Sequence, residues 1–378
     1  MKNDMLGLIF AENPEVSMGE LTNHRALPAV PFGGRYRIID FILSNMVNSS
    51  VINVGIATTY NHQSLSDHLE TGKAWDLDRK NNGLFILPPK ESRDTAPERK
   101  GGLDIINGAK NYLDRSRQEY VVVSDCNTIC NISFDDALRK HIETEADITM
   151  ICSKAGKLSQ AELKRNILLD VNDDGVIEDI QVYPSKQKSN MTMTYMHMFI
   201  IRKELLIDLT DDAVAHGKHY ISKDIFLANM KKLKFCAYEF SGCQLKIDDV
   251  KSFFTANLQL LDKNVRDELF GYKSGMPIYT KVKDTVPTRY GTGAQVSNSM
   301  IADGCLIEGT VKNCILFRGV HIAKGASVEN CIIMQNSEVM ENCMMSNVIF
   351  DKEVVLRSGK KLIGQDTYPM VIGKRTVI

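Results

Sequence analysis

Two pairs of basic residues have the types and spacing that could do chemistry in this sequence. Arg35 and Arg37 flank one residue directly after a double glycine, and Lys374 and Arg375 are adjacent near the end of the chain. An arginine offers phosphate a planar fork of hydrogen-bond donors. The four residues are therefore our candidates for an anion-binding site. The alternative stays open that they are ordinary solvated charges, with Arg37 a buried partner of Asp40.

The charge balance and the cysteine content of the sequence argue against several kinds of binding partner and against a zinc site. The 378 residues include 46 Lys and Arg against 47 Asp and Glu, so nothing global attracts nucleic acid or an anionic membrane. The nine cysteines are scattered, and Cys126 and Cys130 lack the second pair that a zinc site needs. No apolar run reaches about 18 residues, and the first residues lack a signal-peptide core. We expect a cytoplasmic protein that contacts neither nucleic acid nor membrane.

Alternating strand and helix patterns predict how residues 1–265 are built. Short runs rich in β-branched residues are predicted as buried strands at 6–10, 51–58, 120–124, 148–153 and 196–201. Amphipathic stretches between them, at 105–113 and 134–143, are predicted as helices. This alternation is typical of an α/β domain with a mostly parallel sheet and helices on both faces.

Two local signals refine this domain. The run Asn-Asp-Asp-Gly at 172–175 lies between two apolar runs, which predicts a hairpin and a local antiparallel excursion. Residues 248–261 place Val250, Phe254 and Leu258 on one helical face. This stretch is predicted as the helix that closes the domain.

A hexapeptide period replaces this pattern after a linker at 266–289. In residues 290–378, one aliphatic residue recurs every five or six positions: Val311, Leu316, Ile322, Val328, Ile333 and Val339. One inward aliphatic residue in about six is the period of a triangular parallel β-helix. Ordinary hairpins would space apolar residues by two, so we expect a left-handed parallel β-helix domain.

The sequence resembles the sugar-1-phosphate nucleotidyltransferases, and specifically the bacterial glucose-1-phosphate adenylyltransferases. The resemblance is strongest in the run Pro-Ala-Val-Pro-Phe-Gly-Gly-Arg-Tyr-Arg-Ile-Ile-Asp-Phe at 28–41. Further matches keep the family's order at 43–45, 75–79, 87–89, 100–101 and 223–225. The resemblance covers nearly the whole chain. It implies a Rossmann-like nucleotidyltransferase domain before the β-helix, and a reaction of ATP with glucose 1-phosphate that uses Mg²⁺.

The residues that this resemblance assigns to the nucleotide are missing. In register with the family, Glu12, Asn13 and Glu15 stand at the glycines of the phosphate loop, and Ser17 stands at its arginine. Leu27 replaces a lysine. Bare backbone amides and cations bind a triphosphate, whereas carboxylates repel it. The two glutamates can equally be solvated loop residues, but the glycines and the arginine are absent either way.

The resemblance also locates two magnesium carboxylates, and neither is present. Asn127 stands at the first position and Lys246 at the second. An asparagine lacks the charge that a hard cation needs, and a lysine repels it. Asp125 and Asp248 lie two residues away from these positions, so an active enzyme with a rearranged metal site stays open as an alternative.

Recognition of the sugar phosphate is altered as well. Tyr183 stands where the family has the lysine that meets the sugar phosphate. Met193 and Tyr195 replace a serine and a glycine beside the sugar. Bulky side chains are therefore expected in the family's glucose pocket. We expect no catalytic residue and no metal ligand in this chain.

These losses resemble a divergent subunit type of the family, called GlgD in glycogen synthesis. We expect a regulatory, catalytically impaired subunit that joins a catalytic adenylyltransferase subunit in a heterotetramer. The catalytic partner would use Mg²⁺, and this chain would bind no cofactor. Family members respond to phosphorylated metabolites held between the domains, which implies an effector-binding role for Arg35, Arg37, Lys374 and Arg375. A second alternative is a hexapeptide-repeat acyltransferase using His321, against which the whole first domain argues.

Overall fold

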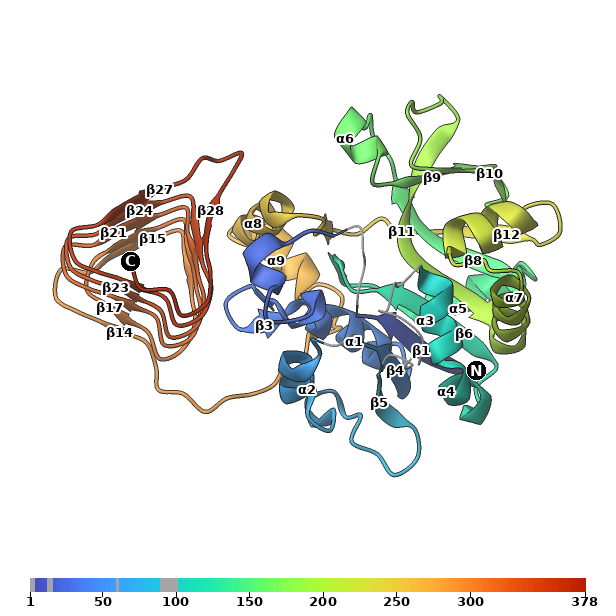
Figure 1. Cartoon of the computed structure of the whole chain (residues 1–378), viewed down its shortest axis with the longest axis horizontal. Coiled ribbons are helices and arrows are strands. Elements are labelled where there is room, and N and C mark those ends of the chain that lie inside the picture. Colours follow the sequence, from blue (N-terminus) through green and yellow to red (C-terminus); the bar gives the residue numbers. More distant parts are fainter. Residues whose placement is uncertain (1–3, 12–15, 59–60, 89–100) are drawn as a thin grey trace.

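The computed structural model describes residues 4–11, 16–58, 61–88 and 101–378, which form an α/β domain followed by a solenoid (Figure 1). The α/β domain is built on a nine-stranded sheet with the order β10-β9-β11-β6-β1-β4-β5, and β8 joins β12 to β11. The strands are β1 (Met5–Phe10), β4 (Asn53–Ala57), β5 (Gly83–Leu87), β6 (Tyr120–Asp125), β8 (Ile148–Lys154), β9 (Ile167–Val171), β10 (Ile177–Val182), β11 (Met191–Arg202) and β12 (Phe235–Glu239).

Strand β1 shows why the sheet is covered on both faces. Met5 and Ile9 pack into one apolar core, whereas Leu6, Leu8 and Phe10 pack into a second core on the opposite face. This is the alternation of side chains that an extended strand imposes. Helices α1 (Ile38–Asn48), α5 (Phe134–Glu143) and α8 (Val250–Gln259) contribute to the first core, and α3 (Gly102–Gly108), α4 (Lys110–Arg115) and α7 (Lys203–Ala215) contribute to the second.

The predicted fold class is confirmed, with two local differences. The run at 172–175 turns between β9 and β10, which pair antiparallel as predicted. The stretch 105–113 is not one helix, because α3 ends at Gly108 and α4 begins at Lys110. Glycine has poor helix propensity, which accounts for a break at this point. The stretch 248–261 forms α8, which begins only at Val250.

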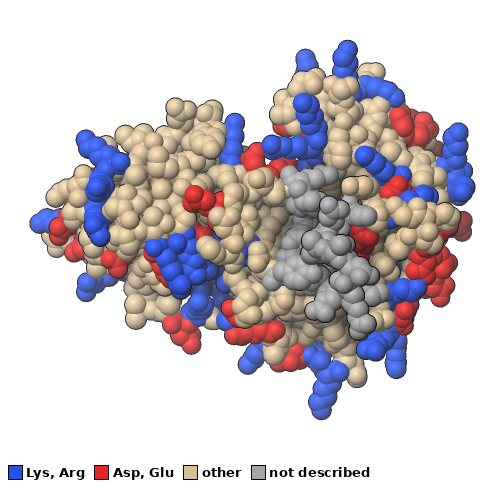
Figure 2. All heavy atoms as spheres, in the orientation of Figure 1, with Lys and Arg blue, Asp and Glu red and all other residues tan. Residues whose placement is uncertain are grey.

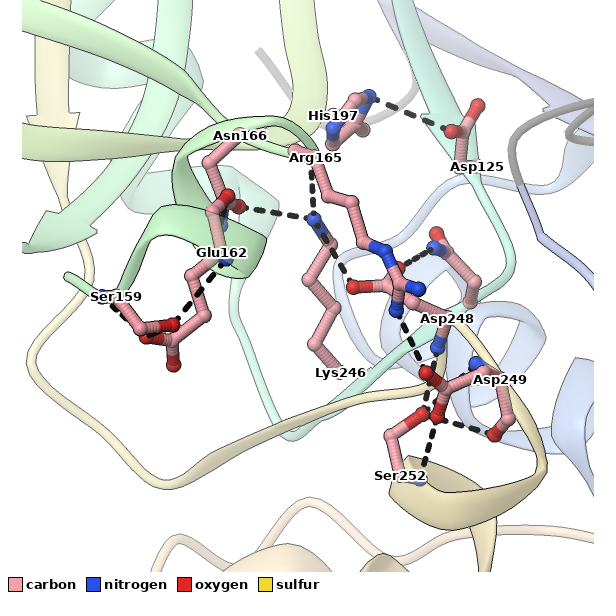
Figure 3. Close-up of polar contacts among 11 residues, drawn as sticks. Asp125, Ser159, Glu162, Arg165, Asn166, His197, Lys246, Asp248, Asp249 and Ser252 are labelled. Carbon is pink, nitrogen blue, oxygen red and sulfur yellow. Dashed lines mark hydrogen bonds and ion pairs between the residues drawn. The ribbon is translucent and has the colours of Figure 1, made fainter. Parts of the chain in front are cut away.

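Strand β11 makes the sheet mixed and carries a bulge. It runs antiparallel to β6, β8 and β9, while β1, β4, β5 and β6 are parallel. Its register with β8 shifts between Tyr195 and Met198, and His197 within the shift has a φ of 57°. A bulge re-aims a side chain. Here it directs His197 toward the carboxyl end of β6 (Figure 3).

The solenoid consists of three parallel five-stranded sheets, as the hexapeptide period predicts. Val311 pairs with Val328, Leu316 with Ile333 and Ile322 with Val339, and all six are fully buried. The sheets are β14 (Arg289–Tyr290), β17 (Leu306–Ile307), β20 (His321–Ile322), β23 (Glu338–Val339) and β26 (Val355–Leu356); β15 (Gln295–Ser297), β18 (Thr310–Lys312), β21 (Ser327–Glu329), β24 (Met344–Ser346) and β27 (Lys361–Ile363); and β16 (Met300–Ile301), β19 (Ile315–Leu316), β22 (Ile332–Ile333), β25 (Val348–Phe350) and β28 (Met370–Ile372).

Asparagines turn the corners of the solenoid. Asn298, Asn313 and Asn330 have φ values of 42°, 51° and 51°, a left-handed conformation that asparagine tolerates better than most residues. Their amides also stack: Asn298 donates to Asn313 Oδ1 at 2.8 Å, and Asn313 donates to Asn330 Oδ1 at 3.1 Å. Each corner therefore supports the next coil.

The two parts share one core. Ile315, Phe317 and Ile332 of the solenoid belong to the apolar core that also contains α1 and α8. A buried ion pair crosses the same junction, where both Nη atoms of Arg25 donate to the carboxylate of Asp351 at 2.8 and 2.9 Å. The solenoid is therefore packed against the α/β domain, and the junction is a fixed part of the fold.

Among the residues described, no helix combines the length and the apolar character needed to cross a bilayer.

Candidate functional site

A cleft of about 500 Å³ collects several charged side chains of the α/β domain (Figure 3). Its lining includes Arg165, Asn166, Lys246, Asp248 and Asp249. These residues come from three places: the segment after α6 (Gln160–Leu163), strand β13 (Gln244–Lys246) and the start of α8. The cleft thus lies where α6 and the segment after it face β13 and α8.

Pairing of β13 brings the two predicted metal positions together. Strand β13 runs antiparallel to β7 (Thr128–Cys130), with Lys246 opposite Thr128. The next amide, of Ile247, donates to the carbonyl of Asn127 at 2.9 Å. The register of this short ladder therefore sets Lys246 beside Asn127, as the resemblance implies for a pair of metal ligands.

The ammonium of Lys246 occupies the centre of this site. Its Nζ donates to the carbonyl of Arg165 at 3.1 Å and to Asn166 Oδ1 at 2.9 Å, and lies 3.5 Å from Asp248 Oδ2. Lys246 is 26 % exposed and Asp248 is 19 % exposed. A cation supplied by the chain itself therefore gathers three oxygen atoms that a bound metal ion could otherwise attract.

Asn127 contacts the same carboxylate. Its Nδ2 donates to Asp248 Oδ1 at 3.2 Å, and its Oδ1 is buried without a hydrogen-bond partner among the described residues. Both oxygens of Asp248 are thus engaged by donors of the chain. Within the part of the chain that the structure describes, no group of three or more His, Cys, Asp or Glu could hold a metal ion. A magnesium ion does not fit this arrangement, since Mg²⁺ is held by carboxylates.

Asp125, the other substitute ligand considered from the sequence, faces a histidine. Its Oδ2 lies 3.5 Å from Nδ1 of His197 on the bulge of β11 (Figure 3). Burial, and next the charge of Lys246, lower the pKa of His197 to about 3. The imidazole is neutral at physiological pH, so it adds no second positive charge to the site.

An exposed pair closes one side of the cleft. Arg165 Nη1 donates to Asp249 Oδ2 at 2.6 Å, and Asp249 caps α8 by accepting from the amide of Ser252 at 2.8 Å. Burial raises the pKa of Asp249, but the hydrogen bonds from Arg165 and Ser252 outweigh it and the pKa is lowered. Asp249 therefore stays ionised and links α8 to the segment after α6.

Three bulky side chains stand at the positions that the resemblance assigns to the sugar and its phosphate. Tyr195 is buried, and its ring lies 5.8 Å from that of Phe226 in an edge-to-face contact. Met193 packs against the same core. Tyr183 has a φ of 51°, and the partly buried side chain packs against this core as well. The three substitutions therefore contribute to the apolar packing of the domain.

The predicted phosphate loop lies only in part within the described residues. Glu12, Asn13 and Glu15 lie outside the described residues. Ser17 is described, and its amide donates to the carbonyl of Asp248 at 3.1 Å. Leu27 is buried in the first core. The backbone at Ser17 is therefore tied to the link between β13 and α8.

The four predicted anion-binding residues do not form one cluster. Arg35 lines a cavity of about 570 Å³ at the junction, together with Arg266, Tyr272 and Ser299. Arg37 points elsewhere: its Nη1 donates to the carbonyl and, at 3.1 Å, to the hydroxyl of Ser64. Burial, with a smaller opposite effect of Asp40, lowers the pKa of Arg37 to about 10.

A lysine that the sequence did not single out, Lys352, follows Asp351, the partner of Arg25 in the solenoid. Burial lowers the pKa of Lys352 to about 7, and the charges of Arg37, Arg25 and Lys374 act in the same direction. Lys374 thus acts on the charge of Lys352, whereas Arg375 pairs with Glu353 through Nε at 2.6 Å. Figure 2 shows Lys and Arg side chains gathered where the solenoid meets the α/β domain.

Sequence reasoning missed Arg25 and Lys352 because their partners are remote. Arg25 meets Asp351 only through the packing of the solenoid, 326 positions along the chain. No local periodicity marks either residue. His321, the residue of the acyltransferase alternative, lies on the solenoid surface, where its Nε2 is 3.2 Å from Glu308 Oε2.

Comparison with known proteins identifies families that match both parts of the chain. The family model "Nucleotidyl transferase" matches residues 18–262, and "GlmU-like, C-terminal hexapeptide" matches residues 283–369. The chain is 36% identical to "Glycogen biosynthesis protein GlgD" of Bacillus subtilis over 99% of its length and 97% of that protein. It is 38% identical to the protein of the same name from Geobacillus stearothermophilus, over 87% and 84% of the two chains.

An adenylyltransferase is similar over a comparable length. The chain is 32% identical to "Glucose-1-phosphate adenylyltransferase" of Clostridium perfringens, over 100% of its own length and 95% of that protein. The similarity spans both the α/β domain and the solenoid, so it assigns the whole chain to one family. The chain belongs to the nucleotidyl transferase family, within the group of glucose-1-phosphate adenylyltransferases and GlgD glycogen biosynthesis proteins.

Proposed function

We propose that this chain is a regulatory, catalytically impaired subunit of glucose-1-phosphate adenylyltransferase in glycogen biosynthesis. In this function it assembles with a catalytic subunit and modulates that partner's formation of ADP-glucose. The observation that carries the proposal is the ammonium of Lys246, 3.5 Å from Asp248 Oδ2 in the cleft. The names of the relatives, which include glycogen biosynthesis proteins and adenylyltransferases, support the pathway.

The electrostatics of the cleft support impaired catalysis. Adenylyl transfer brings together two phosphorylated substrates and needs a divalent cation held by carboxylates. Two unit charges 4 Å apart interact by about 4 kcal/mol at an effective dielectric of 20, and the repulsion of a divalent ion by one ammonium is about twice that. Lys246 therefore opposes the ion that the reaction requires, and Asn127 does not offset this effect.

The basic residues at the junction support a regulatory role. Arg37, Arg25 and Lys374 all lower the pKa of Lys352; Arg25 pairs with Asp351, whereas Arg37, Lys352 and Lys374 make no ion pair within the described residues. A phosphorylated metabolite would relieve the repulsion among the remaining cations. Because the junction joins both domains, an anion bound there would couple to their packing, and coupling free energies of about 1–3 kcal/mol are typical of allosteric sites.

The first test of the proposal is an assay of the isolated chain. With ATP, glucose 1-phosphate and Mg²⁺, we expect no measurable release of pyrophosphate. Release that disappears in Asp125→Asn or Asp248→Asn would instead establish the rearranged metal site, and the proposal would be wrong. Coenzyme A binding lost in His321→Ala would establish the acyltransferase alternative.

The second test adds the catalytic subunit encoded by the same organism. We expect the two chains to co-elute and the mixture to differ from the catalytic subunit alone in kcat or in substrate KM. Separate elution with unchanged kinetics would contradict the proposal. In the mixture, Lys374→Gln should reduce the response to sugar phosphates more than Arg375→Gln, because Arg375 already pairs with Glu353.

A further inference from the structure

A third cavity, of about 570 Å³, lies at the edge of the sheet and has no part in the proposed function. Its lining comes from β4, the edge strand β5 and α4, with the segments that precede β5 and β6 (Figure 1). Asn53, the first residue of β4, lines it, whereas Asn127, which contacts Asp248 of the cleft, lies just beyond the last residue of β6. Because these strands are parallel, the cavity reaches the opposite end of the sheet from the cleft.

The lining carries unpaired positive charge. Lys80, Arg115 and Arg117 are exposed and line the cavity, and none of them makes an ion pair within the described residues. No aspartate or glutamate is among the described lining residues. Nearby cations differ in this respect, since Lys110 pairs with Asp211 and Arg202 with Glu119. Three unpaired cations without a carboxylate favour an anionic ligand.

An aromatic surface lies beside these cations. Phe85 is 41% exposed, and its ring centroid is 5.5 Å from that of the buried Tyr112. The hydroxyl of Tyr112 lies 3.1 Å from Asn53 Oδ1. A side chain at Gly55 would bring its Cβ within 2.7 Å of the Tyr112 ring, so this glycine permits the close packing. The exposed ring of Phe85 thus rests on a fixed support and can stack on a planar group.

Two amides complete the lining. Asn81 and Asn111 are exposed, and their side chains make no hydrogen bond within the described part of the chain. An amide both donates and accepts, which suits the edge of a heterocyclic base or a ribose. The volume lies within the range of about 300–1,000 Å³ that is usual for small-molecule sites.

We propose that this cavity binds a nucleotide, with its phosphates at Lys80, Arg115 and Arg117 and its base stacked on Phe85. The charge pattern disfavours a neutral glucan, which would leave the cations unpaired. Inorganic phosphate would leave the ring and the amides unused. A nucleotide uses all three kinds of group, and at this end of the sheet it would bind separately from the cleft and the junction.

Calorimetric titration of the full-length protein tests this site with ADP, adenosine and inorganic phosphate in magnesium-free buffer. We expect ADP to bind at least about tenfold more tightly than either fragment. Arg115→Gln/Arg117→Gln should weaken ADP about tenfold or more, because charge-assisted hydrogen bonds are lost. Phe85→Ala should weaken ADP and adenosine but leave phosphate unchanged.

A matched control removes two exposed lysines elsewhere, in Lys231→Gln/Lys232→Gln, and should leave ADP binding unchanged. Lys80→Gln gives an independent variant if the double arginine variant fails to fold. Absence of ADP binding would overturn the proposal. So would ADP binding that is insensitive to Phe85→Ala and to every cation variant, which would place the nucleotide elsewhere, or equal affinity for ADP and phosphate, which would indicate a plain anion patch.

Discussion

At the scale of single residues, the proposal of impaired catalysis depends most on Lys246. It contacts Asp248, and Asn127 contacts the other oxygen of the same carboxylate. In Lys246→Asp/Asn127→Asp, three carboxylates would surround the position now taken by the ammonium. We expect this double variant to bind Mn²⁺ at least about tenfold more tightly than the native chain, because carboxylate oxygens are the preferred ligands. Electron paramagnetic resonance of free Mn²⁺ measures the change.

Lys251→Asp is the matched control for that experiment. Lys251 lines the same cleft, so the substitution replaces a lysine by an aspartate, as Lys246→Asp does, near but not at the ammonium position. If Lys251→Asp increased Mn²⁺ affinity as much as the double variant, general charge rather than the replaced ligands would explain the result.

Lys352 is predicted to make stability depend on pH. Burial, with Arg37, Arg25 and Lys374, lowers its pKa to about 7, while the unfolded chain holds the proton up to about pH 10.4. Between these values the unfolded state binds more protons, so the contribution of Lys352 to stability rises with pH, by at most about 1.4 kcal/mol for each pH unit. Below about pH 7 the destabilisation by Lys352 is fully present.

Urea unfolding of Lys352→Met across pH 6–10 tests this prediction. The variant should be more stable than the native chain at pH 6, and the two should converge as the pH rises. Lys360→Met, which removes an exposed lysine of the same solenoid, should show no such convergence. A difference between native and Lys352→Met protein that is constant with pH would show that Lys352 keeps an ordinary pKa.

At the scale of elements, the buried ion pair between Arg25 and Asp351 is predicted to hold the solenoid to the α/β domain. Arg25→Ala would leave the carboxylate of Asp351 buried without its partner, and breaking such a pair typically costs about 3–5 kcal/mol. Arg25→Lys retains the charge but loses the bidentate geometry, so its loss of stability should be smaller. The free energy of unfolding in urea measures both.

Arg375→Ala provides the contrast, since its pair with Glu353 is exposed and should matter little. Equal stability of Arg25→Ala and Arg375→Ala would mean that burial of the first pair has no energetic consequence at this junction.

The helices and strands also show which parts of the fold could be predicted from the sequence. Strands 6–10 and 120–124 could be predicted because buried parallel strands are continuous apolar runs, and the solenoid because its period repeats along the chain. The break between α3 and α4 was missed, since the apolar pattern continues through Gly108. The site depended on the family resemblance, which supplied Asn127 and Lys246. Their convergence on Asp248, and that of Arg25 on Asp351, are products of tertiary packing that no local pattern records.

At the scale of the whole molecule, Lys246 lies in the cleft, whereas Leu27, Tyr183, Met193 and Tyr195, which also differ from the family's pattern, belong to the apolar packing of the α/β domain. Ile315, Phe317 and Ile332 of the solenoid share a core with α1 and α8, and the basic residues lie along the same junction. A subunit of this kind can transmit a change at the junction to a neighbour without turning over substrate, provided that a ligand binds its two arrangements with different affinity.

Lys352 gives this coupling a measurable signature. A phosphate ester bound among Arg37, Lys352 and Lys374 would favour the charged lysine, so binding near pH 8 should take up a proton. Titrations of a sugar phosphate in two buffers of different ionisation enthalpy should therefore differ. In Lys352→Met the difference should vanish, and the mixed enzyme should lose its response to the sugar phosphate while the two subunits still co-elute. A full response of the Lys352→Met assembly would show that the effector acts at a site other than this junction.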